Sequence, residues 1–305
     1  MKYAVTGGAG FIGSNIVKHL LEENHTVKVI DNLHAGKLEN LEEIEDKIDF
    51  VKLDILDYDR LSKELNDLDG VFHEAALTSV PESFLHEEEY TQVNVVGTEN
   101  IFKIAREFDI KVVFASSAAV FGNTIKIPIS ENTERKPINP YGMTKLSDEL
   151  LAKKYADLGT KIIGLRYFNV YGPRQNIDYA GVITKFLEKI SNKKSPIIFG
   201  DGSQTRDFIF VSDVARANLH AMKSEHTNDF YNIGTGTSLS VKELAHIMIL
   251  LSELPLEPKN SELPEGDIIS SQADITKAKT DLSWKPEVVL EDGLKKFFPK
   301  KSNIL

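Results

Sequence analysis

Short apolar runs alternate with longer amphipathic stretches through the first half of the chain. The amphipathic stretches include 14–22 and 87–108, where apolar residues recur at the spacing of a helix. The apolar runs are 3–6, 27–30, 50–53, 70–72 and 112–114. Continuous apolar runs of this length, separated by helices, are typical of parallel strands that are buried on both faces. The pattern therefore predicts an α/β fold with a doubly wound parallel sheet.

The regular alternation ends near Arg166. A further apolar helix is predicted over 241–252, and a turn-rich segment starts at Leu254 and Pro255. Because no clean linker separates the two halves, we expect a smaller α/β lobe near the C-terminus that is built from insertions after the last strands. The predicted division assigns 1–171 and roughly 207–248 to the sheet domain, and roughly 172–206 and 249–305 to the lobe.

Composition narrows the classes of partner and compartment. With a net charge of -10, a pI near 5.4 and no basic block, the chain is not expected to bind nucleic acid or an anionic membrane. The absence of cysteine excludes disulfides, a thiol nucleophile and a thiolate metal site. No apolar run approaches the ~20 residues of a membrane span, and Met1 leads into the first strand without room for a signal peptide. We therefore expect a cytoplasmic protein without a metal site.

A glycine-rich turn follows the first apolar run and opens the first predicted helix. Its glycines fit G-x-G-x-x-G as Gly8, Gly10 and Gly13, and G-x-x-G-x-x-G when Gly7 replaces Gly8. Glycine tolerates positive φ and lets the backbone approach a pyrophosphate, while the helix N-terminus offers N–H donors. The second run ends in Asp31, whose carboxylate can accept hydrogen bonds from ribose hydroxyls and would repel a 2′-phosphate. The turn therefore predicts a dinucleotide site that prefers NAD to NADP.

Several polar or small residues stand where an apolar run ends. They are Thr6, Asp31, Asp54, Ala75 and Ser117. Because the carboxyl ends of parallel strands share one edge of the sheet, we expect these residues to surround a common crevice. Asp54 is a candidate to bond the adenine amino group while Ile55 packs on the ring, and a surface acid at a strand end is the alternative. His73 is interpreted as a structural histidine.

A tyrosine and a lysine share one face of the helix that is predicted to begin at Pro140. Tyr141 and Lys145 are one helical turn apart. A phenol has a pKa of about 10, and a nearby ammonium lowers it toward the range of a general base. Ser117 would reach the same crevice, and no acid–histidine pair accompanies it, which argues against a hydrolase nucleophile. Taken alone, the spacing also fits an ordinary solvated helix face.

The order of these motifs resembles one family over almost the whole chain. The stretches are TGGAGFIG at 6–13, DNL at 31–33, HEAALTSVPES at 73–83, NVVGTEN at 94–100, SSAAVFG at 116–122, PYGMTK at 140–145, RYFNVYGPRQ at 166–175, RDFIFVSD at 206–213, NIGTG at 232–236 and AD at 273–274, followed by Trp284 and Pro286. They resemble the extended short-chain dehydrogenase/reductases, and among them the nucleotide-sugar 4-epimerases. The resemblance implies a Rossmann-like fold, tightly held NAD, a UDP-sugar substrate and a homodimer formed through 87–108 and 140–158.

The resemblance also assigns roles to the residues of the crevice. Tyr141 would remove the proton of the sugar 4-hydroxyl while hydride passes to NAD, and the 4-keto sugar would turn over and take the hydride back on its other face. Lys145 would lower the pKa of Tyr141 and hold the nicotinamide ribose, while Ser117 assists the proton transfer. The implied cofactor-binding residues are Gly7, Gly10, Phe11, Ile12, Gly13, Asp31, Asn32, Asp54, Ile55, Ala75, Ala76, Asn94, Tyr141, Lys145 and Tyr167. The implied substrate-binding residues are Ser117, Tyr141, Asn169, Arg206 and Ser271.

Two alanines after Ser117 favour one branch of this family. Related dehydratases carry Asp-Glu there and decarboxylases a Glu, to protonate a leaving hydroxyl or to steer a β-keto acid. Ala118 and Ala119 can do neither. We therefore expect epimerisation at C4 of a UDP-hexose. A UDP-glucuronate 4-epimerase and a sugar-nucleotide oxidoreductase with net hydride transfer are the alternatives.

Three positions bear on the diphosphate. By resemblance, Asn169 contacts the diphosphate or the sugar, and Arg206 clamps phosphate oxygens. The alternatives are a structural turn at Asn169 and an ion pair between Arg206 and Asp207. Pro264 replaces a second diphosphate arginine of the family, which leaves Arg174 or a displaced lysine to compensate.

Ser271 bears on the choice of sugar. In this family a bulky tyrosine at its position is associated with simple hexoses, whereas a small residue leaves room for an N-acetyl group at C2. Ser271 is small. We therefore expect UDP-N-acetylglucosamine and UDP-N-acetylgalactosamine as substrates, alone or together with UDP-glucose and UDP-galactose.

Overall fold

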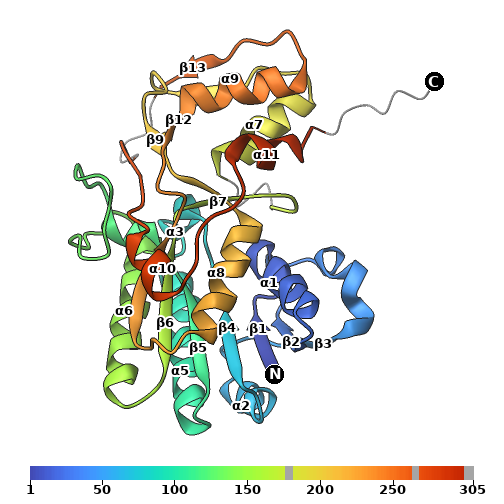
Figure 1. The fold of residues 1–305 in the computed structure, drawn as a ribbon, viewed down its shortest axis with the longest axis vertical. Coiled ribbons are helices and arrows are strands. Elements are labelled where there is room, and N and C mark those ends of the chain that lie inside the picture. The colour runs from blue at the N-terminus through green and yellow to red at the C-terminus, as the bar shows by residue number, and fades with distance from the viewer. Residues whose placement is uncertain (176–180, 263–267, 299–305) are drawn as a thin grey trace.

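A seven-stranded parallel sheet forms the centre of the molecule (Figure 1). The computed structural model describes residues 1–175, 181–262 and 268–298. The strands are β1 (Lys2–Thr6), β2 (Thr26–Asp31), β3 (Ile48–Lys52), β4 (Gly70–His73), β5 (Lys111–Ser117), β6 (Ile162–Tyr167) and β11 (Asp229–Ile233). They lie in the order β11-β6-β5-β4-β1-β2-β3. Strands β2 and β3 are added on one side of β1, and β4 and the later strands on the other, so the strand order reverses between β1 and β4. This order confirms the predicted doubly wound, Rossmann-like sheet.

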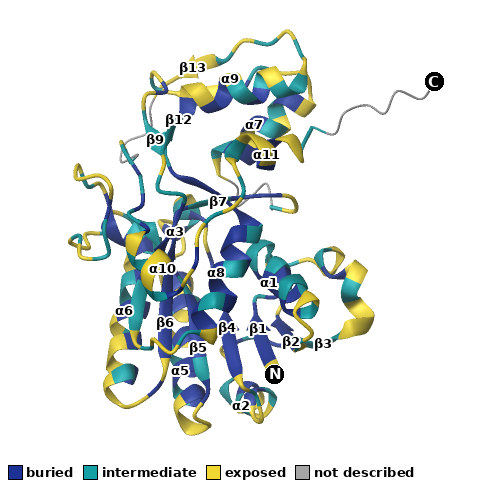
Figure 2. Ribbon diagram, viewed as in Figure 1, coloured by how far each residue is buried: buried dark blue, intermediate teal, exposed yellow. Residues whose placement is uncertain are grey.

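Helices cover both faces of this sheet (Figure 2). On one face lie α1 (Phe11–Glu22) and α8 (Val211–Lys223), and on the other α2 (Tyr58–Leu65), α5 (Gly97–Glu107) and α6 (Pro140–Asp157). Each face buries its own apolar cluster against the sheet. Because neither face meets water, the inner strands are apolar almost throughout, and every residue of β6 is buried.

The stretch 87–108, predicted as one helix, is broken in the structure. The short helix α4 (Glu87–Tyr90) leads into a π-helical turn, η3 (Thr91–Val96), and α5 follows. The turn contains Asn94, which is fully buried. Single π-turns inside helices are frequent at functional sites, because the extra residue changes the direction in which a side chain points.

A smaller lobe lies beyond the carboxyl ends of the strands (Figure 1). Its helices are α7 (Val182–Ser191), α9 (Val241–Ser252) and α11 (Leu290–Lys295). Three two-stranded sheets accompany them: β7 (Asn169–Tyr171) with β10 (Phe208–Phe210), β9 (Thr205–Arg206) with β12 (Leu239–Ser240), and β8 (Ile197–Phe199) with β13 (Lys259–Ser261). Other short helical elements are α3 (Val80–Ser83), η1 (Leu38–Asn40), η2 (Glu42–Lys47), η4 (Ala118–Phe121) and α10 (Thr276–Asp281).

Packing departs from the predicted division of the chain at two places. Helix α9 packs on α7 and places Leu244 in the core of the lobe, whereas the sequence assigns most of this helix to the sheet domain. Conversely, α10 packs on β11, and Trp284 is buried in the core of the sheet domain. The indole N–H of Trp284 donates to the carbonyl of Asp213 in α8 at 3.0 Å. Segments distant in sequence therefore share each core.

The strand ends that the sequence placed around one crevice do share one edge of the sheet. β1 ends at Thr6, β2 at Asp31, β4 at His73 and β5 at Ser117, and neighbouring strands are in parallel register. None of the helices within the described ranges has both the length and the apolar character of a membrane span.

Candidate active site

The glycine-rich turn between β1 and α1 packs against the chain that leaves β4. Gly7 has a φ of +67°, and a Cβ on it would lie 2.7 Å from the backbone nitrogen of Ala75. A Cβ on Gly13 would lie 2.2 Å from the carbonyl oxygen of Gly7. Only glycine permits contacts this short. Gly10 precedes α1 and has no side chain to cap it, and an uncapped helix start is where phosphate groups bind.

A cleft of about 740 Å³ opens beside this turn, along the ends of β1, β2 and β4. Its volume falls within the range of roughly 300–1,000 Å³ that is typical of small-molecule and cofactor sites. The predicted cofactor-binding residues that line it are Gly7, Gly10, Asp31, Asn32, Asp54, Ile55, Ala75 and Ala76. Phe11, Ile12 and Gly13 form the first turn of the adjoining helix α1. These residues fit a dinucleotide, with glycines for the pyrophosphate and carboxylates for the ribose and adenine.

Asp31 is held firmly in the wall of this cleft. Its Oδ2 accepts a hydrogen bond from the N–H of Ala9 at 2.9 Å, and its Oδ1 accepts one from Leu33 at 2.7 Å. Burial raises the pKa of the Asp31 carboxyl above its ordinary value, although both N–H donors oppose the shift. A Cβ on Gly36 would lie 2.8 Å from either carboxylate oxygen. The local backbone therefore fixes the position of the carboxylate.

Asn32 and Asp54 connect the ends of β2 and β3. Asn32 Nδ2 donates to Asp54 Oδ2 at 2.9 Å, while Asp54 Oδ1 accepts from the N–H of Leu56 at 2.9 Å. The cleft is also lined by 85–89 and by Gln92, which the sequence did not single out. These residues do not directly follow a strand, whereas the other residues were predicted because each stands at the end of one.

Ser117 and Tyr141 lie on adjoining elements. Asn139 caps α6, its Oδ1 accepting from the N–H of Gly142 at 2.8 Å, and Pro140 opens the helix as predicted. A Cβ on Gly142 would lie 2.9 Å from the carbonyl oxygen of Ala119. The N–H of Ala119 in turn donates to Ser117 Oγ at 3.1 Å. The start of the helix that carries Tyr141 is thus packed against the turn that orients Ser117.

Lys145 is buried one helical turn after Tyr141. Its Nζ donates to Asp148 Oδ2 at 3.3 Å. Burial by itself lowers the pKa of Lys145, but the nearby Asp148, Tyr141 and Glu74 side chains outweigh it and raise the pKa above its ordinary value. Lys145 is therefore a fixed cation beside the tyrosine, which argues against the solvated helix face.

Glu74 lines the cleft and faces Tyr167 at the end of β6. The hydroxyl of Tyr167 donates to Glu74 Oε1 at 2.8 Å and accepts from Asn218 Nδ2 at 2.7 Å. Burial raises the pKa of Glu74 to about 8, against the opposing effects of Tyr167 and Lys145. Tyr167, predicted to bind the cofactor, is a buried residue that holds this carboxyl in place.

His73 and Asn94 make their contacts with the protein itself. The ring nitrogens of His73 bond Thr6 Oγ1 at 2.7 Å and Thr98 Oγ1 at 2.9 Å, and burial, with Lys145, lowers its pKa to about 3. Asn94 Oδ1 accepts from the N–H of Leu77 at 2.8 Å. Asn94 Nδ2 donates to the carbonyl of Leu77 and to Thr144 Oγ1, both at 3.0 Å. Asn94, which the resemblance places at the cofactor, thus ties a cleft-lining residue to α6.

Arg206 and Ser271, two of the predicted substrate residues, belong to neighbouring segments. Arg206 lies in β9 and donates from Nη1 to the carbonyl of Thr205 at 2.9 Å. The N–H of Ser271, which is buried, donates to the same carbonyl at 3.1 Å. Asn169 begins β7, and its N–H donates to the carbonyl of Asp207 at 3.0 Å. The three predicted residues are thus connected through the backbone of 205–207.

The carboxylate of Asp207 accepts hydrogen bonds from two segments that are far apart from it and from each other in the sequence. Its Oδ1 accepts from the N–H and the hydroxyl of Thr235, both at 2.7 Å. Its Oδ2 accepts from Gly236 at 3.0 Å and from Ala273 at 3.1 Å. The side chain of Asp207, which the sequence considered only as an ion-pair partner of Arg206, therefore holds the segment that carries Ser271.

Pro264, which stands where the family has a second diphosphate arginine, and Arg174, expected to compensate for it, differ in what the structure shows of them. Pro264 lies outside the described residues. Arg174 donates from Nη1 to the carbonyl of Asn40 at 3.0 Å and pairs through Nη2 with Glu43 at 3.2 Å. Asn40 in turn donates from Nδ2 to the carbonyl of Ala9 at 2.8 Å. Arg174 thus lies near the glycine-rich turn.

Two acids that the sequence did not single out lie on α6, close to the face that carries Tyr141 and Lys145. Asp148 and Glu149 are fully buried, one turn after Lys145. Tyr141, Lys145 and Glu149 follow the i, i+4, i+8 spacing of one helix face, which was a usable signal in the sequence. Within the part of the chain that the structure describes, no group of three or more His, Asp or Glu side chains could hold a metal ion.

Comparison with known proteins places this site in a family. Residues 3–234 match the model of the NAD dependent epimerase/dehydratase family. A UDP-glucose 4-epimerase from Mycolicibacterium smegmatis is 38% identical, with 99% of this chain and 100% of the relative covered. The structure of a UDP-N-acetylglucosamine 4-epimerase from Methanobrevibacter ruminantium, in complex with UDP-N-acetylmuramic acid, is 39% identical, with a TM-score of 0.93 and coverage of 97% and 96%. That of a UDP-glucose 4-epimerase from Thermotoga maritima with UDP-glucose is 37% identical, with a TM-score of 0.92 and the same coverage.

The matches extend over the parts of the chain that carry the chemistry described above. The family model spans the glycine-rich turn, Ser117, Tyr141 and Lys145, and the two structures also cover the smaller lobe. The chain belongs to the NAD dependent epimerase/dehydratase family, and within it to the UDP-sugar 4-epimerases that use NAD.

Proposed function

We propose that this protein interconverts the C4 epimers of a UDP-hexose through a transient 4-keto sugar. One observation carries the proposal above the others. Tyr141, beside the buried cation of Lys145, lies at the start of a helix that packs against the turn that orients Ser117. Glu74, which lines the cleft that fits a dinucleotide, is among the groups that raise the pKa of Lys145. The UDP-glucose 4-epimerases from Mycolicibacterium smegmatis and Thermotoga maritima, to which the chain is similar, support it.

The chain's own residues would carry the proton in this reaction. Tyr141 takes the proton of the sugar 4-hydroxyl, and the positive charge of Lys145 stabilises the negative charge on the tyrosine oxygen before that step. Ser117, oriented by the N–H of Ala119, shares the proton with the substrate hydroxyl. NAD, when bound, supplies the acceptor and donor of hydride. Because no group leaves the sugar, no further carboxylic acid is required where Ala118 and Ala119 stand.

One assay tests the reaction as a whole. The purified protein is incubated separately with UDP-glucose, UDP-N-acetylglucosamine and UDP-glucuronate, the C4 epimers are resolved, and NADH absorbance is followed. We expect epimer formation from at least one of the first two without net NADH. Steady release of NADH would show that the protein is a dehydrogenase and not an epimerase. Epimerisation of UDP-glucuronate alone would show that the substrate is a UDP-sugar acid and not a simple or N-acetylated UDP-hexose.

We further propose that the substrates are UDP-N-acetylglucosamine and UDP-N-acetylgalactosamine, alone or with UDP-glucose and UDP-galactose. Ser271 is small and buried, next to the segment that carries Arg206. Ser271→Tyr should abolish the activity on the N-acetyl pair and spare the simple hexoses, because the larger side chain would fill the space that the N-acetyl group needs. Ser271→Ala is the matched control and should retain both activities. Equal loss on both substrate pairs in Ser271→Tyr would contradict the assignment.

We also propose a homodimer that forms through the outer faces of α5 and α6. Met143 and Leu150 on α6 are about half exposed, as is Leu158 just after it. Sedimentation of Leu150→Glu should show a shift toward monomer. Leu250→Glu, on the exposed face of α9, is the control and should sediment as the unmodified protein does. A monomeric unmodified protein would remove the proposal.

A further inference from the structure

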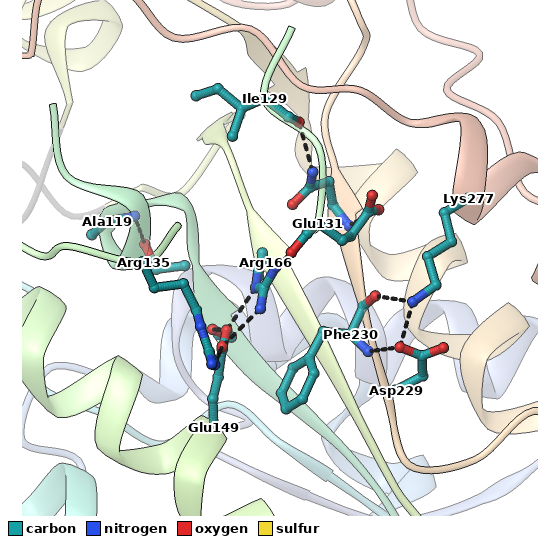
Figure 3. Close-up of polar contacts among 12 residues, drawn as sticks. Ala119, Ile129, Glu131, Arg135, Glu149, Arg166, Asp229, Phe230 and Lys277 are labelled. Carbon is teal, nitrogen blue, oxygen red and sulfur yellow. Dashed lines mark hydrogen bonds and ion pairs between the residues drawn. The ribbon is translucent and has the colours of Figure 1, made fainter. Parts of the chain in front are cut away.

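The carboxylate of Glu149 joins the catalytic helix to three other segments (Figure 3). Its Oε1 accepts hydrogen bonds from Ser116 Oγ and Arg166 Nε, both at 2.7 Å. Its Oε2 accepts from Arg166 Nη2 and Arg135 Nη1, both at 2.8 Å. These four bonds saturate the roughly four acceptor sites of a carboxylate. Burial acts to raise the pKa of Glu149, but Arg166 outweighs it and holds the pKa below its ordinary value.

Arg166 fixes the sheet side of this arrangement. Its guanidinium carbon lies 5.0 Å from the ring centroid of Phe121 and 5.2 Å from that of Phe230. Its Nη1 donates to the carbonyl of Glu131 at 3.0 Å. Because Arg166 also binds Glu149 through two nitrogens, it would keep that carboxylate paired if another partner were removed.

The loop 129–135 runs from this cluster to the sugar side of the crevice. At one end Arg135 bonds Glu149 on α6. At the other end the N–H of Ile129 donates to the carbonyl of Gln272, and the N–H of Asp274 donates to the carbonyl of Ile129, both at 2.8 Å. Asn232 Nδ2 reinforces this bridge by donating to the carbonyls of Ile129 at 2.9 Å and Asp274 at 3.3 Å. The loop thus contacts the chain immediately after Ser271.

A small apolar cluster packs the same parts together. Ile129 of the loop and Ala273 of the sugar segment are buried with Val120 and Phe121 of η4, the turn that follows Ser117. Leu146, next to Lys145 on α6, packs against this cluster. A shift of the loop would therefore be transmitted to the segment after Ser271, because a packed core leaves little room for independent movement.

We propose that Arg135 is a positioning residue for sugar recognition: by tying the loop 129–135 to Glu149 on the catalytic helix, it sets the position of 271–274. The effect on sugar recognition rests on the proposed function, whereas the mechanical coupling between Arg135 and 271–274 does not. Arg135 makes a single bond to Glu149, so its loss leaves the Arg166 pair and the residues Ser117 and Tyr141 in place.

Three variants separate this role from a general effect on stability. Arg135→Met removes the bond to Glu149 and keeps the length of the side chain. Arg135→Lys retains a cation that can reach the carboxylate. Lys136→Met removes a cation immediately after this loop whose partner, Glu134, lies at 3.0 Å with both side chains 73% exposed. An exposed pair of this kind contributes little to stability, so Lys136→Met is the matched control.

The first measurement is the kinetics on UDP-N-acetylglucosamine and UDP-glucose. Arg135→Met should raise KM by about fivefold or more and move the ratio of kcat/KM for the two sugars toward one, with kcat changed by less than about twofold. Arg135→Lys should restore most of the ratio, and Lys136→Met should match the unmodified protein. A fall in kcat with KM and the ratio unchanged would overturn the role in sugar recognition, as would an Arg135→Met variant that behaves like Lys136→Met.

The second measurement needs no substrate. Hydrogen exchange of the unliganded protein reports the amides of Ile129 and Asp274, which form the bridge between the two segments. Arg135→Met should accelerate exchange at both amides by about tenfold and leave the sheet amides unchanged, whereas Lys136→Met should change neither. Unchanged protection of Asp274 in Arg135→Met would overturn the coupling, whatever sugar the enzyme accepts. A protein that epimerises no UDP-sugar but shows the accelerated exchange would remove the proposed function alone.

Discussion

The cofactor cleft and the sugar side of the crevice are held in place by different kinds of contact. In the cleft, the backbone of Gly7 packs directly against that of Ala75, and the Asp31 carboxylate accepts N–H bonds from Ala9 and Leu33 in the adjoining turns. On the sugar side, one buried carboxylate, Asp207, collects donors from Thr235, Gly236 and Ala273. The shape of the cofactor cleft follows from the parallel register of β1, β2 and β4.

This difference has consequences for how each region tolerates change. Where the sheet itself supplies the geometry, replacing a polar side chain should affect the ligand more than the fold. Where a buried side chain supplies the geometry, the same kind of change leaves N–H donors without partners, and each buried unsatisfied group costs about 1–3 kcal/mol. The sugar side should therefore be the more fragile region.

The largest effect is expected where the two regions meet. Tyr141→Phe should lower kcat by about 10²- to 10⁴-fold, the usual contribution of a general base, while the protein still binds NAD and UDP. Initial rates together with calorimetric titration check this. Tyr155→Phe, farther along α6 where the hydroxyl bonds Glu99 at 3.1 Å, is the control and should retain full activity. A Tyr141→Phe enzyme with more than a tenth of the activity would show that the proton has another acceptor.

Asp207→Ala should be the most damaging change on the sugar side. The loss of its acceptors should reduce the free energy of unfolding by about 2–4 kcal/mol and weaken UDP-sugar binding more than tenfold. The affinity for NAD should change little. Denaturant unfolding and titration with each ligand make the comparison, with Asp201→Ala as the control, since Asp201 is exposed and accepts its hydrogen bonds from Ser203, two residues away. Equal weakening of both ligands would break the distinction between the two regions.

On the cofactor side, Asp31→Asn should act on the ligand rather than on the fold. The affinity for NAD should fall by roughly tenfold and the preference for NAD over NADP should shrink, because the amide no longer repels a 2′-phosphate. UDP binding should be unchanged. Titration with NAD, NADP and UDP measures all three. An Asp31→Asn protein that loses UDP affinity as strongly as NAD affinity would argue that the two regions share one support.

The smallest effect is a pH dependence on the cofactor side, at Glu74. Its pKa of about 8 in the folded protein exceeds the ordinary value of a glutamate, so between about pH 5 and 8 the folded state holds a proton that the unfolded state has lost. Stability contributed by this group therefore decreases as pH rises through that window. Glu74→Gln should flatten the decrease by on the order of 1 kcal/mol, allowing for the solvent that reaches the cleft.

Denaturant unfolding at pH 5, 6.5 and 8, roughly spanning this window, measures the Glu74 effect. Glu225→Gln, at an exposed position beyond the end of α8, is the matched control and should follow the unmodified protein. A Glu74→Gln profile that runs parallel to that of the unmodified protein would show that Glu74 does not hold the proton.

The sequence predicted the glycine-rich turn and the start of α6 because their signals are local. A glycine turn, a strand end and a helix cap each depend on neighbours within a few residues, as Asn139 and Pro140 illustrate at the start of α6. The π-turn at Asn94 was not predicted, because it accompanies bonds to Leu77 and Thr144, which belong to other elements. No local pattern in 87–108 contains that information.

The sugar side was harder to predict for the same physical reason. The role of Asp207 depends on Thr235 and Ala273, and the packing of α9 on α7 joins segments that are far apart in the chain. Glu149 could have been predicted from the sequence, since it continues the helical spacing of Tyr141 and Lys145. Its partners Arg135 and Arg166 could not be paired with it without the fold.

The discontinuous sugar side also constrains how such proteins can be recombined. Every residue predicted to bind the cofactor falls between Gly7 and Tyr167, so a single crossover after β6 would transfer that site whole from one gene to another. The same crossover would separate Ile129 from Gln272 and Asp274, which bond each other in the present structure. Chimeric genes should therefore exchange cofactor sites readily, whereas exchange of sugar recognition requires that 129–135 and 271–274 come from the same parent.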